Sequence, residues 1–162
     1  MDPKLIDQYG SGGAKLLGSI AGLSRQDLLW VPPAEARIGR WSIQQIVIHL
    51  MDSDLIWSSR MKSIIAEDNP AILSFDENKF VASLFYEDQN AESAAGLLDL
   101  NRRQFAKVLR KLPDSSFSRT GWHSERGTIA LREIVQLMVE HIDHHLGFIS
   151  KKREKLAKPL KD

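Results

Sequence analysis

The chain has 162 residues, 43% of them hydrophobic, which is enough to bury a full core and predicts one domain over residues 1–162. Its 22 basic and 21 acidic residues leave a formal net charge of +1, so no overall field draws it toward nucleic acid or an anionic membrane. The sequence contains no cysteine, which excludes disulfides, thiolate metal ligands and a cysteine nucleophile together.

Helical periodicity begins at the N-terminus. Apolar residues spaced at three and four predict a helix over about 3–21, and Gly10, Gly12 and Gly13 weaken its middle. A short helix over 24–29 follows, which begins with a serine cap and ends before two prolines.

A second long helix is predicted over about 42–67, with Ser42 as its cap and His49 among its apolar positions. The segment 69–88 mixes proline and aromatic residues with polar ones, and it is typical of a connection with one short helix. Because this connection is too long for a tight turn, we expect the long helices on either side of it to run parallel.

A third long helix is predicted over about 91–111, followed by a polar loop over 114–127. Thr128 is the expected cap of a fourth helix that reaches about residue 152, and the basic tail after it suits the negative end of the helix dipole. The predicted fold is an all-α, four-helix bundle with one long crossover connection.

Three of the five histidines lie within five positions near the end of the chain. His141 and His145 are four residues apart, so they share one face of the predicted helix, and the surrounding apolar residues turn that face inward. His49 lies on the apolar face of another helix. A buried neutral imidazole needs a hydrogen-bond partner or a metal ion. One such histidine is more often a packing residue, but this combination favours a metal site. His144, at the edge of the apolar face, and His123, in a polar stretch, are weaker candidates.

Three motifs carry a family resemblance. They are Trp41-Ser42-Ile43 leading to Ile48-His49-Leu50-Met51-Asp52, Thr120-Gly121-Trp122-His123 ahead of Gly127-Thr128-Ile129, and His141-Ile142-Asp143-His144-His145 near the end. Together they resemble the DinB/YfiT superfamily over most of the chain. The resemblance implies a four-helix bundle that holds a divalent metal through His49, His141 and His145, and it implies a homodimer. The superfamily includes proteins regarded as metal-dependent hydrolases and transferases that join low-molecular-weight thiols to electrophiles, so it implies the fold more directly than the reaction.

A set of three imidazoles is typical of a catalytic metal site, since structural zinc is usually closed by four protein ligands. Zinc held in this way lowers the pKa of a bound water toward ~7, or it can hold a substrate thiol as the thiolate. Nitrogen ligands suit zinc, nickel, copper or iron better than magnesium or calcium. We therefore expect a divalent metal, with Zn²⁺ first and Ni²⁺ as the alternative.

No general base stands out from the sequence. The zincin motif places a glutamate directly after its first histidine, where this chain has Ile142, and Asp143 is turned away from the ligand face. Asp52, one turn after His49, could orient that ring, complete the coordination sphere or accept a proton, or it could be a surface residue. Three tryptophans could line a pocket or pack in the core, namely Trp41, Trp57 and Trp122.

Two classes of function remain open. The first is a metal-dependent enzyme, with transfer of a small cellular thiol to an electrophile ahead of hydrolysis by metal hydroxide. The second is a stress-associated binding or dimerisation module with a structural metal. No stretch approaches the length of a transmembrane helix, and residues 1–4 lack the character of a signal peptide. We expect a cytoplasmic protein that binds a small molecule and neither nucleic acid nor membrane.

Overall fold

The computed structural model describes residues 1–160. Four long helices form the body of the molecule: α1 (Pro3–Ile20), α3 (Ile43–Ala66), α5 (Ala91–Leu109) and α6 (Leu131–Lys155). The connections contain the short helices α2 (Arg25–Leu29) and α4 (Glu77–Ser83), two 3₁₀ turns (Ala34–Ala36 and Asp114–Ser118) and the strands β1 (Ala71–Ile72), β2 (Thr120–His123) and β3 (Gly127–Ala130). The predicted four-helix bundle is confirmed. Among these described residues, no helix combines the length and the apolar character needed to cross a membrane.

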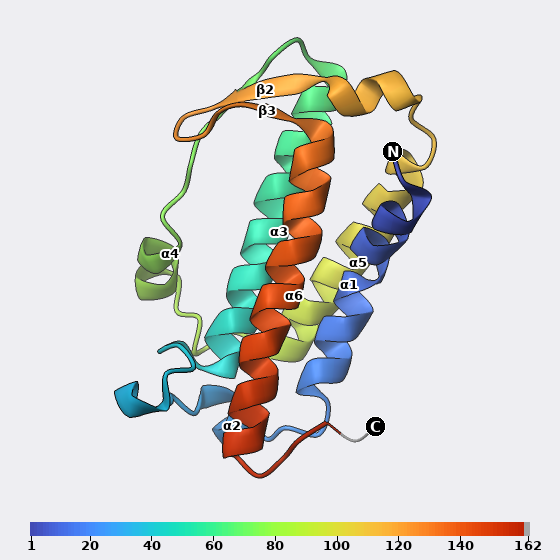
Figure 1. The fold of residues 1–162 in the computed structure, drawn as a ribbon. Coiled ribbons are helices and arrows are strands. Elements are labelled where there is room, and N and C mark those ends of the chain that lie inside the picture. The colour runs from blue at the N-terminus through green and yellow to red at the C-terminus, as the bar shows by residue number, and fades with distance from the viewer. Residues whose placement is uncertain (161–162) are drawn as a thin grey trace.

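The four long helices do not simply alternate in direction. Figure 1 shows α3 and α5 running one way and α1 and α6 running the other, with α4 in the connection beside α3. Contacts along α3 agree. Gln44, near its start, donates to the carbonyl of Gln89 just before α5 (2.8 Å), and Asp54, further along, accepts from Asn101 of α5 (2.7 Å). The predicted parallel pair and its long crossover are therefore confirmed.

A capping box defines the start of α3. Ser42 Oγ accepts a hydrogen bond from the Gln45 N–H (3.1 Å), and Gln45 Oε1 accepts from the Ser42 N–H (2.9 Å). These reciprocal bonds satisfy N–H groups that the first turn leaves free. From that start, His49 falls on the buried side of the helix and is only 1% exposed.

The prediction of a polar loop over 114–127 is wrong in its second half, where the chain forms a hairpin. β2 pairs antiparallel with β3 and parallel with β1 in a three-stranded sheet. Each strand has four residues or fewer, too few for a two-residue alternation to be visible in the sequence. Figure 1 shows the hairpin lying across the ends of α3 and α6.

The hairpin also shifts the start of the last helix. Thr128 does not cap it but lies in β3, opposite Trp122. α6 begins after Ala130, whose N–H donates to the Glu133 carboxylate at 2.7 Å. At its far end the helix continues through the predicted basic tail as far as Lys155.

The glycines of α1 lie where it packs against α5. A Cβ atom at Gly13 would lie 2.2 Å from the Asp99 Cα, and one at Gly12 would lie 2.6 Å from the Arg102 Nη1. Glycine thus lets the two helices approach more closely than any other residue would allow. The same residues that lower the intrinsic helix propensity of α1 make its tertiary packing possible.

The core is divided into two hydrophobic clusters with buried polar side chains between them. Along α3 one cluster ends at Met51 and the other begins at Met61, and along α5 the interval runs from Leu98 to Phe105. The buried polar residues at this level include Ser53, Asp54, Ser58 and Arg102, with His49 at the edge. The middle of the bundle therefore holds a layer of buried polar side chains.

Candidate metal centre

The three histidines singled out from the sequence meet where α3 packs against α6. The Nε2 atom of His141 lies 3.1 Å from the Nε2 of His49 and 3.1 Å from the Nε2 of His145. One ligand atom from each residue lies within 4.8 Å of the others. α6 therefore supplies two rings from successive turns, and α3 supplies the third.

Burial keeps these three rings neutral. Desolvation lowers the pKa of His49 and of His145 to about 3, and that of His141 to about 4. The charge of Arg102 contributes further to the shift at His141. Neutral rings offer the lone pairs that a metal ion requires.

The hydrogen bonds of the cluster are incomplete. His141 Nε2 makes a short contact with both other rings, but a neutral imidazole nitrogen carries at most one proton. On the other side of the rings, the Nδ1 atoms of His49 and His145 are buried and find no hydrogen-bond partner in residues 1–160. Buried polar atoms are normally paired, and three Nε2 atoms that face one another cannot all be satisfied by their own protons, so an electron-pair acceptor between them would complete the cluster.

Trp41 covers part of the cluster. Its ring centroid lies 4.9 Å from that of His49 and 6.4 Å from that of His145, and its plane is nearly parallel to the His145 ring, at 3°. Trp41 is thus a packing partner of the predicted ligands. It limits the directions from which a small molecule can approach them.

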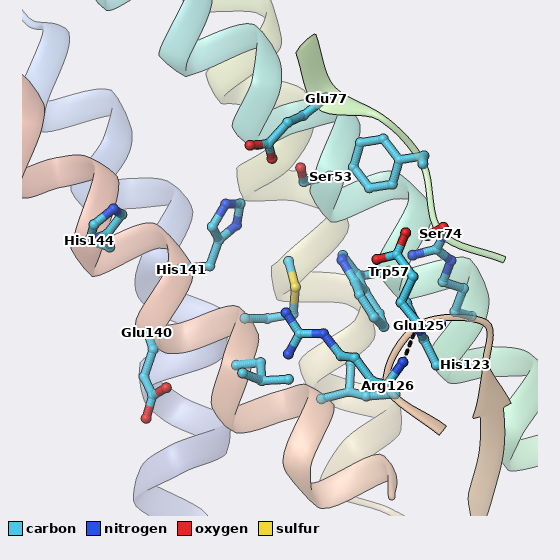
Figure 2. Close-up of a pocket in the computed structure, with 15 residues that line it drawn as sticks. Ser53, Trp57, Ser74, Glu77, His123, Glu125, Arg126, Glu140, His141 and His144 are labelled. Carbon is cyan, nitrogen blue, oxygen red and sulfur yellow. Dashed lines mark hydrogen bonds between the residues drawn. The ribbon is translucent and has the colours of Figure 1, made fainter. Parts of the chain in front are cut away.

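A cavity of about 540 Å³ opens beside His141. Trp57 of α3 and Phe75 of the crossover line it, and His123 and Arg126 of the hairpin close its far end (Figure 2). This volume lies within the range of small-molecule sites, roughly 300–1,000 Å³. The histidine cluster therefore borders a space large enough for a substrate.

Glu77 is the carboxylate closest to the cluster, and no sequence motif indicated it. Its Oε2 lies 3.8 Å from the Nε2 of His49, and its side chain is 53% exposed. Figure 2 shows Glu77 and His141 together at one end of the cavity. Glu77 begins a short helix within the irregular crossover, where no periodicity relates it to the histidines.

Asp52 has a different partner from those predicted. Its Oδ2 accepts a hydrogen bond of 2.6 Å from the Tyr86 hydroxyl, and Asp52 belongs neither to the histidine group nor to the lining of the cavity in the described chain. Burial and this hydrogen bond raise the pKa of Tyr86. Asp52 thus links α3 to Tyr86 at the end of the crossover through a hydrogen bond.

The weaker histidine candidates lie outside the ligand group. His144 is exposed and lines the cavity next to His141. His123 is only 3% exposed, and its ring stacks on that of Trp57 at 5.7 Å and 11°, so its polar sequence context was misleading. Trp122 is 51% exposed on the hairpin, and it neither lines the cavity nor packs in the core of the described residues.

The model of the DinB superfamily matches residues 8–149. The chain belongs to the DinB superfamily. The family expected from the motifs is therefore confirmed.

Two relatives illustrate the DinB-superfamily match. A protein of Oceanobacillus iheyensis is 31% identical over 114 residues, covering 70% of this chain and 66% of the relative. YfiT of Bacillus subtilis is 30% identical over 115 residues, covering 70% and 65%. Both bear the name "Putative metal-dependent hydrolase". The aligned region spans just under two thirds of the length of these relatives.

A solved structure agrees with the sequence match. YfiT of Bacillus subtilis, described as a probable metal-dependent hydrolase with an unusual four-helix bundle topology, matches with a TM-score of 0.87 at 26% identity. The match covers 95% of this chain and 86% of that one. The bundle of this chain, with its parallel α3 and α5, therefore matches a topology already seen in a solved structure.

The donor set in this DinB-superfamily chain fits a divalent metal ion. Three neutral rings from two helices direct Nε2 atoms toward one point, and these atoms lack enough hydrogen-bond donors among themselves. His49, His141 and His145 would hold the ion, and no fourth histidine, aspartate or glutamate joins the group among residues 1–160. Three nitrogen ligands without a fourth protein ligand match the pattern of an open catalytic site.

Proposed function

We propose that this protein is a metal-dependent enzyme that transfers a low-molecular-weight thiol to an electrophilic small molecule. The observation that carries the proposal is the open side of the histidine group, where His141 borders a cavity of about 540 Å³. Zinc is the expected ion and nickel the alternative, because imidazole ligands suit both. When bound, such an ion is a Lewis acid that favours the thiolate form of a thiol ligand and lowers the pKa of a water ligand.

The chain supplies a pocket but no nucleophile of its own. It contains no cysteine, and Ser53, the buried serine of the cavity, forms no hydrogen-bonded arrangement with a histidine and a carboxylate in the described residues. The nucleophile must therefore enter with a substrate. A sulfur lone pair forms the bond to the electrophilic carbon, the leaving group departs with the electron pair of its own bond, and the thiol releases its proton. The products are a thioether and the protonated leaving group.

Glu77 is the residue of this chain placed to accept that proton, since its carboxylate lies at the histidine end of the cavity. Glu77→Gln keeps the size of the side chain and removes its basicity. We expect the variant to retain metal and to lose at least about tenfold in kcat/KM, because a positioned base commonly contributes about 10²–10⁴-fold. An unchanged rate in a variant with full metal content would remove Glu77 from the reaction.

The reaction is tested with metal-loaded protein, a panel of small thiols and a reactive aryl halide. His49→Ala and His145→Ala serve as controls, since each removes one expected ligand. Formation of the thioether should be clearly faster with the unaltered protein than with either variant. Conjugation no faster than in the variants, across all thiols, would reject the transferase proposal.

Metal-dependent hydrolysis is the second candidate, and the names of the relatives favour it. The same samples distinguish it, because hydrolysis of an ester or amide panel needs no thiol. Metal retention with neither activity would instead favour the third candidate, a binding or dimerisation module.

We also propose, on the basis of the family resemblance, that the protein is a homodimer. Sedimentation that shows only the 18.3 kDa chain at high concentration would reject it.

A further inference from the structure

The end of the cavity opposite the histidines gathers hydrogen-bond donors. Arg60, His123 and Arg126 all line the cavity. Figure 2 shows His123 and Arg126 at the hairpin, with the Arg126 side chain reaching across toward α6, whereas Glu77 and His141 lie at the other end. The two ends of the cavity therefore differ in charge.

Arg60 is a half-buried cation without a counter-ion. Its guanidinium lies 4.6 Å from the ring centroid of Trp57 and 5.6 Å from that of Phe75, and its Nη2 donates to the Leu73 carbonyl. Its Nη1 is buried and has no hydrogen-bond partner in residues 1–160. A buried guanidinium nitrogen without an acceptor is unfavourable unless a ligand completes it.

Arg126 also lacks an acidic partner. No ion pair of 4.0 Å or less in the described chain includes Arg126 or Arg60. Glu125, its neighbour in sequence, is exposed and also lines the cavity, but it pairs with neither arginine. Two positive charges and one carboxylate therefore line this part of the cavity, and neither arginine is paired with the carboxylate.

His123 adds a neutral donor between them. Its Nδ1 accepts hydrogen bonds from the backbone N–H groups of Glu125 (3.2 Å) and Arg126 (3.3 Å), so its proton lies on Nε2. Burial, followed by the charges of Arg60 and Arg126, lowers the pKa of the ring. The Glu125 carboxylate opposes this shift, so the charges of all three neighbours act on the His123 ring.

We propose that Arg60, His123 and Arg126 form an anion subsite that holds a carboxylate or phosphate of the acceptor substrate. The reactive carbon of that substrate would then lie toward His141, and Trp57 and Phe75 would flank its apolar body. Guanidinium groups suit both anions because they donate in parallel to two oxygens. This inference rests on the proposed function, since it names the class of acceptor for the same cavity.

The subsite is tested by titrating the protein with benzoate, phenyl phosphate and the uncharged benzamide, followed by NMR. Because an anion could also coordinate a metal, each titration is repeated after the metal is stripped with a chelator. Both anions should bind at least about tenfold more tightly than benzamide in both forms, and their affinity should fall as salt is raised. The stronger of the two anions identifies the group that the subsite prefers.

Two variants assign the effect to these residues. Arg60→Gln and Arg126→Gln should each weaken binding of the anions at least fivefold and leave benzamide binding unchanged. Arg126 is exposed, so its variant addresses the subsite even if Arg60→Gln fails to fold. Arg103→Gln is the matched control, because Arg103 lies on α5 outside the cavity and is 61% exposed, and it should bind all probes like the unaltered protein.

Equal affinity for benzoate, phenyl phosphate and benzamide in the stripped protein would overturn the subsite, as would anion binding that neither arginine variant weakens. These results leave the proposed function untouched, because metal retention and conjugation of an uncharged acceptor are measured independently. Conversely, anion selectivity in a protein that lacks conjugation would preserve the subsite and reject the transferase reaction.

Discussion

Two groups of buried polar side chains lie at the middle of the bundle, and they differ in how fully their hydrogen bonds are satisfied. In the first, Arg102 Nε donates to Asp54 Oδ1 at 2.6 Å, Arg102 Nη2 donates to the Met138 carbonyl at 2.9 Å, and Asn101 donates to Asp54 Oδ2 at 2.7 Å. The side chains of Asp54 and Arg102 are both fully buried. Apart from the Arg102 Nη1, which faces Gly12 and has no partner among residues 1–160, this network is closed within the described part of the chain.

The histidine group, one layer away, is not closed. Its Nε2 atoms face one another, and two of its Nδ1 atoms have no partner among the described residues. An unpaired buried polar group costs roughly 1–3 kcal/mol, and the three Nε2 atoms cannot all be satisfied by one another, so a ligand placed between them would be stabilising. The closed network holds three helices together, whereas the open group is arranged to receive a ligand from outside the chain.

Breaking the closed network should have the largest effect on stability. Arg102→Met removes the charge that faces Asp54 and retains an apolar stem, which leaves a buried carboxylate unpaired. We expect the free energy of unfolding of the metal-free protein to fall by about 3–5 kcal/mol. Urea denaturation followed by circular dichroism measures this change.

The double variant Arg102→Met with Asp54→Leu sharpens that result. It removes both charges, so no buried carboxylate is left unpaired, and it should lose clearly less stability than Arg102→Met alone. Equal losses in the single and double variants would mean that packing, not the uncompensated charge, dominates at this layer.

A smaller effect is expected from crowding the same network. Gly12→Ala would place a Cβ atom 2.6 Å from Arg102 Nη1 and 3.3 Å from Ile142 Cδ1. We expect a loss of about 1–3 kcal/mol, typical of an overpacked core. Gly18→Ala is the control in the same helix, because its Cβ would meet nothing within 4 Å. It should gain up to about 1 kcal/mol from helix propensity, and a loss there equal to that of Gly12→Ala would contradict this view of the contact.

The open group predicts a specific pH dependence in metal-free protein. Burial lowers the pKa of His49 and His145 to about 3 and of His141 to about 4, from 6.5. Between about pH 6 and pH 4 the unfolded chain therefore binds protons that the folded chain does not. The stability that the neutral rings contribute to the folded state is fully present above the pKa of histidine in the unfolded chain. It is lost as pH falls through that window, by up to about 1.4 kcal/mol per pH unit for each histidine.

A pair of variants checks the origin of that slope. His145→Leu should lower the number of protons taken up on unfolding, and with it the slope, by about one proton, since the variant removes one buried neutral ring. His144→Leu should leave it unchanged, because His144 is exposed. Denaturant titrations at several pH values measure the slopes, and the same slope in both variants would show that the buried cluster is not its source.

The sequence allowed the helices and the histidine ligand candidates to be predicted because both depend on local periodicity. The spacing of His141 and His145 fixes their common face, and the capping residues near Ser42 fix the phase that buries His49. The glycines of α1 show the limit of this reasoning. Helix propensity marks them as weak points, and only the approach of α5 reveals why they are needed.

The rest of the site could not be predicted because it depends on irregular segments. Glu77 comes from the crossover and Arg126 from a hairpin of short strands, and neither has a periodic relation to the histidines. His123 was judged by its polar neighbours in sequence, although tertiary packing against Trp57 buries it. Such contacts are set by where the connections run in space.

If one metal ion completes the open histidine group, the metal content of untagged protein will show it. Mass spectrometry of metals should find about one zinc or nickel ion per chain in the unaltered protein and in His144→Ala. Replacing His49, His141 or His145 by Ala should reduce metal retention at least about tenfold, in line with the loss expected when a site is disrupted. A His144 variant without metal beside a His145 variant with a full complement would contradict the account.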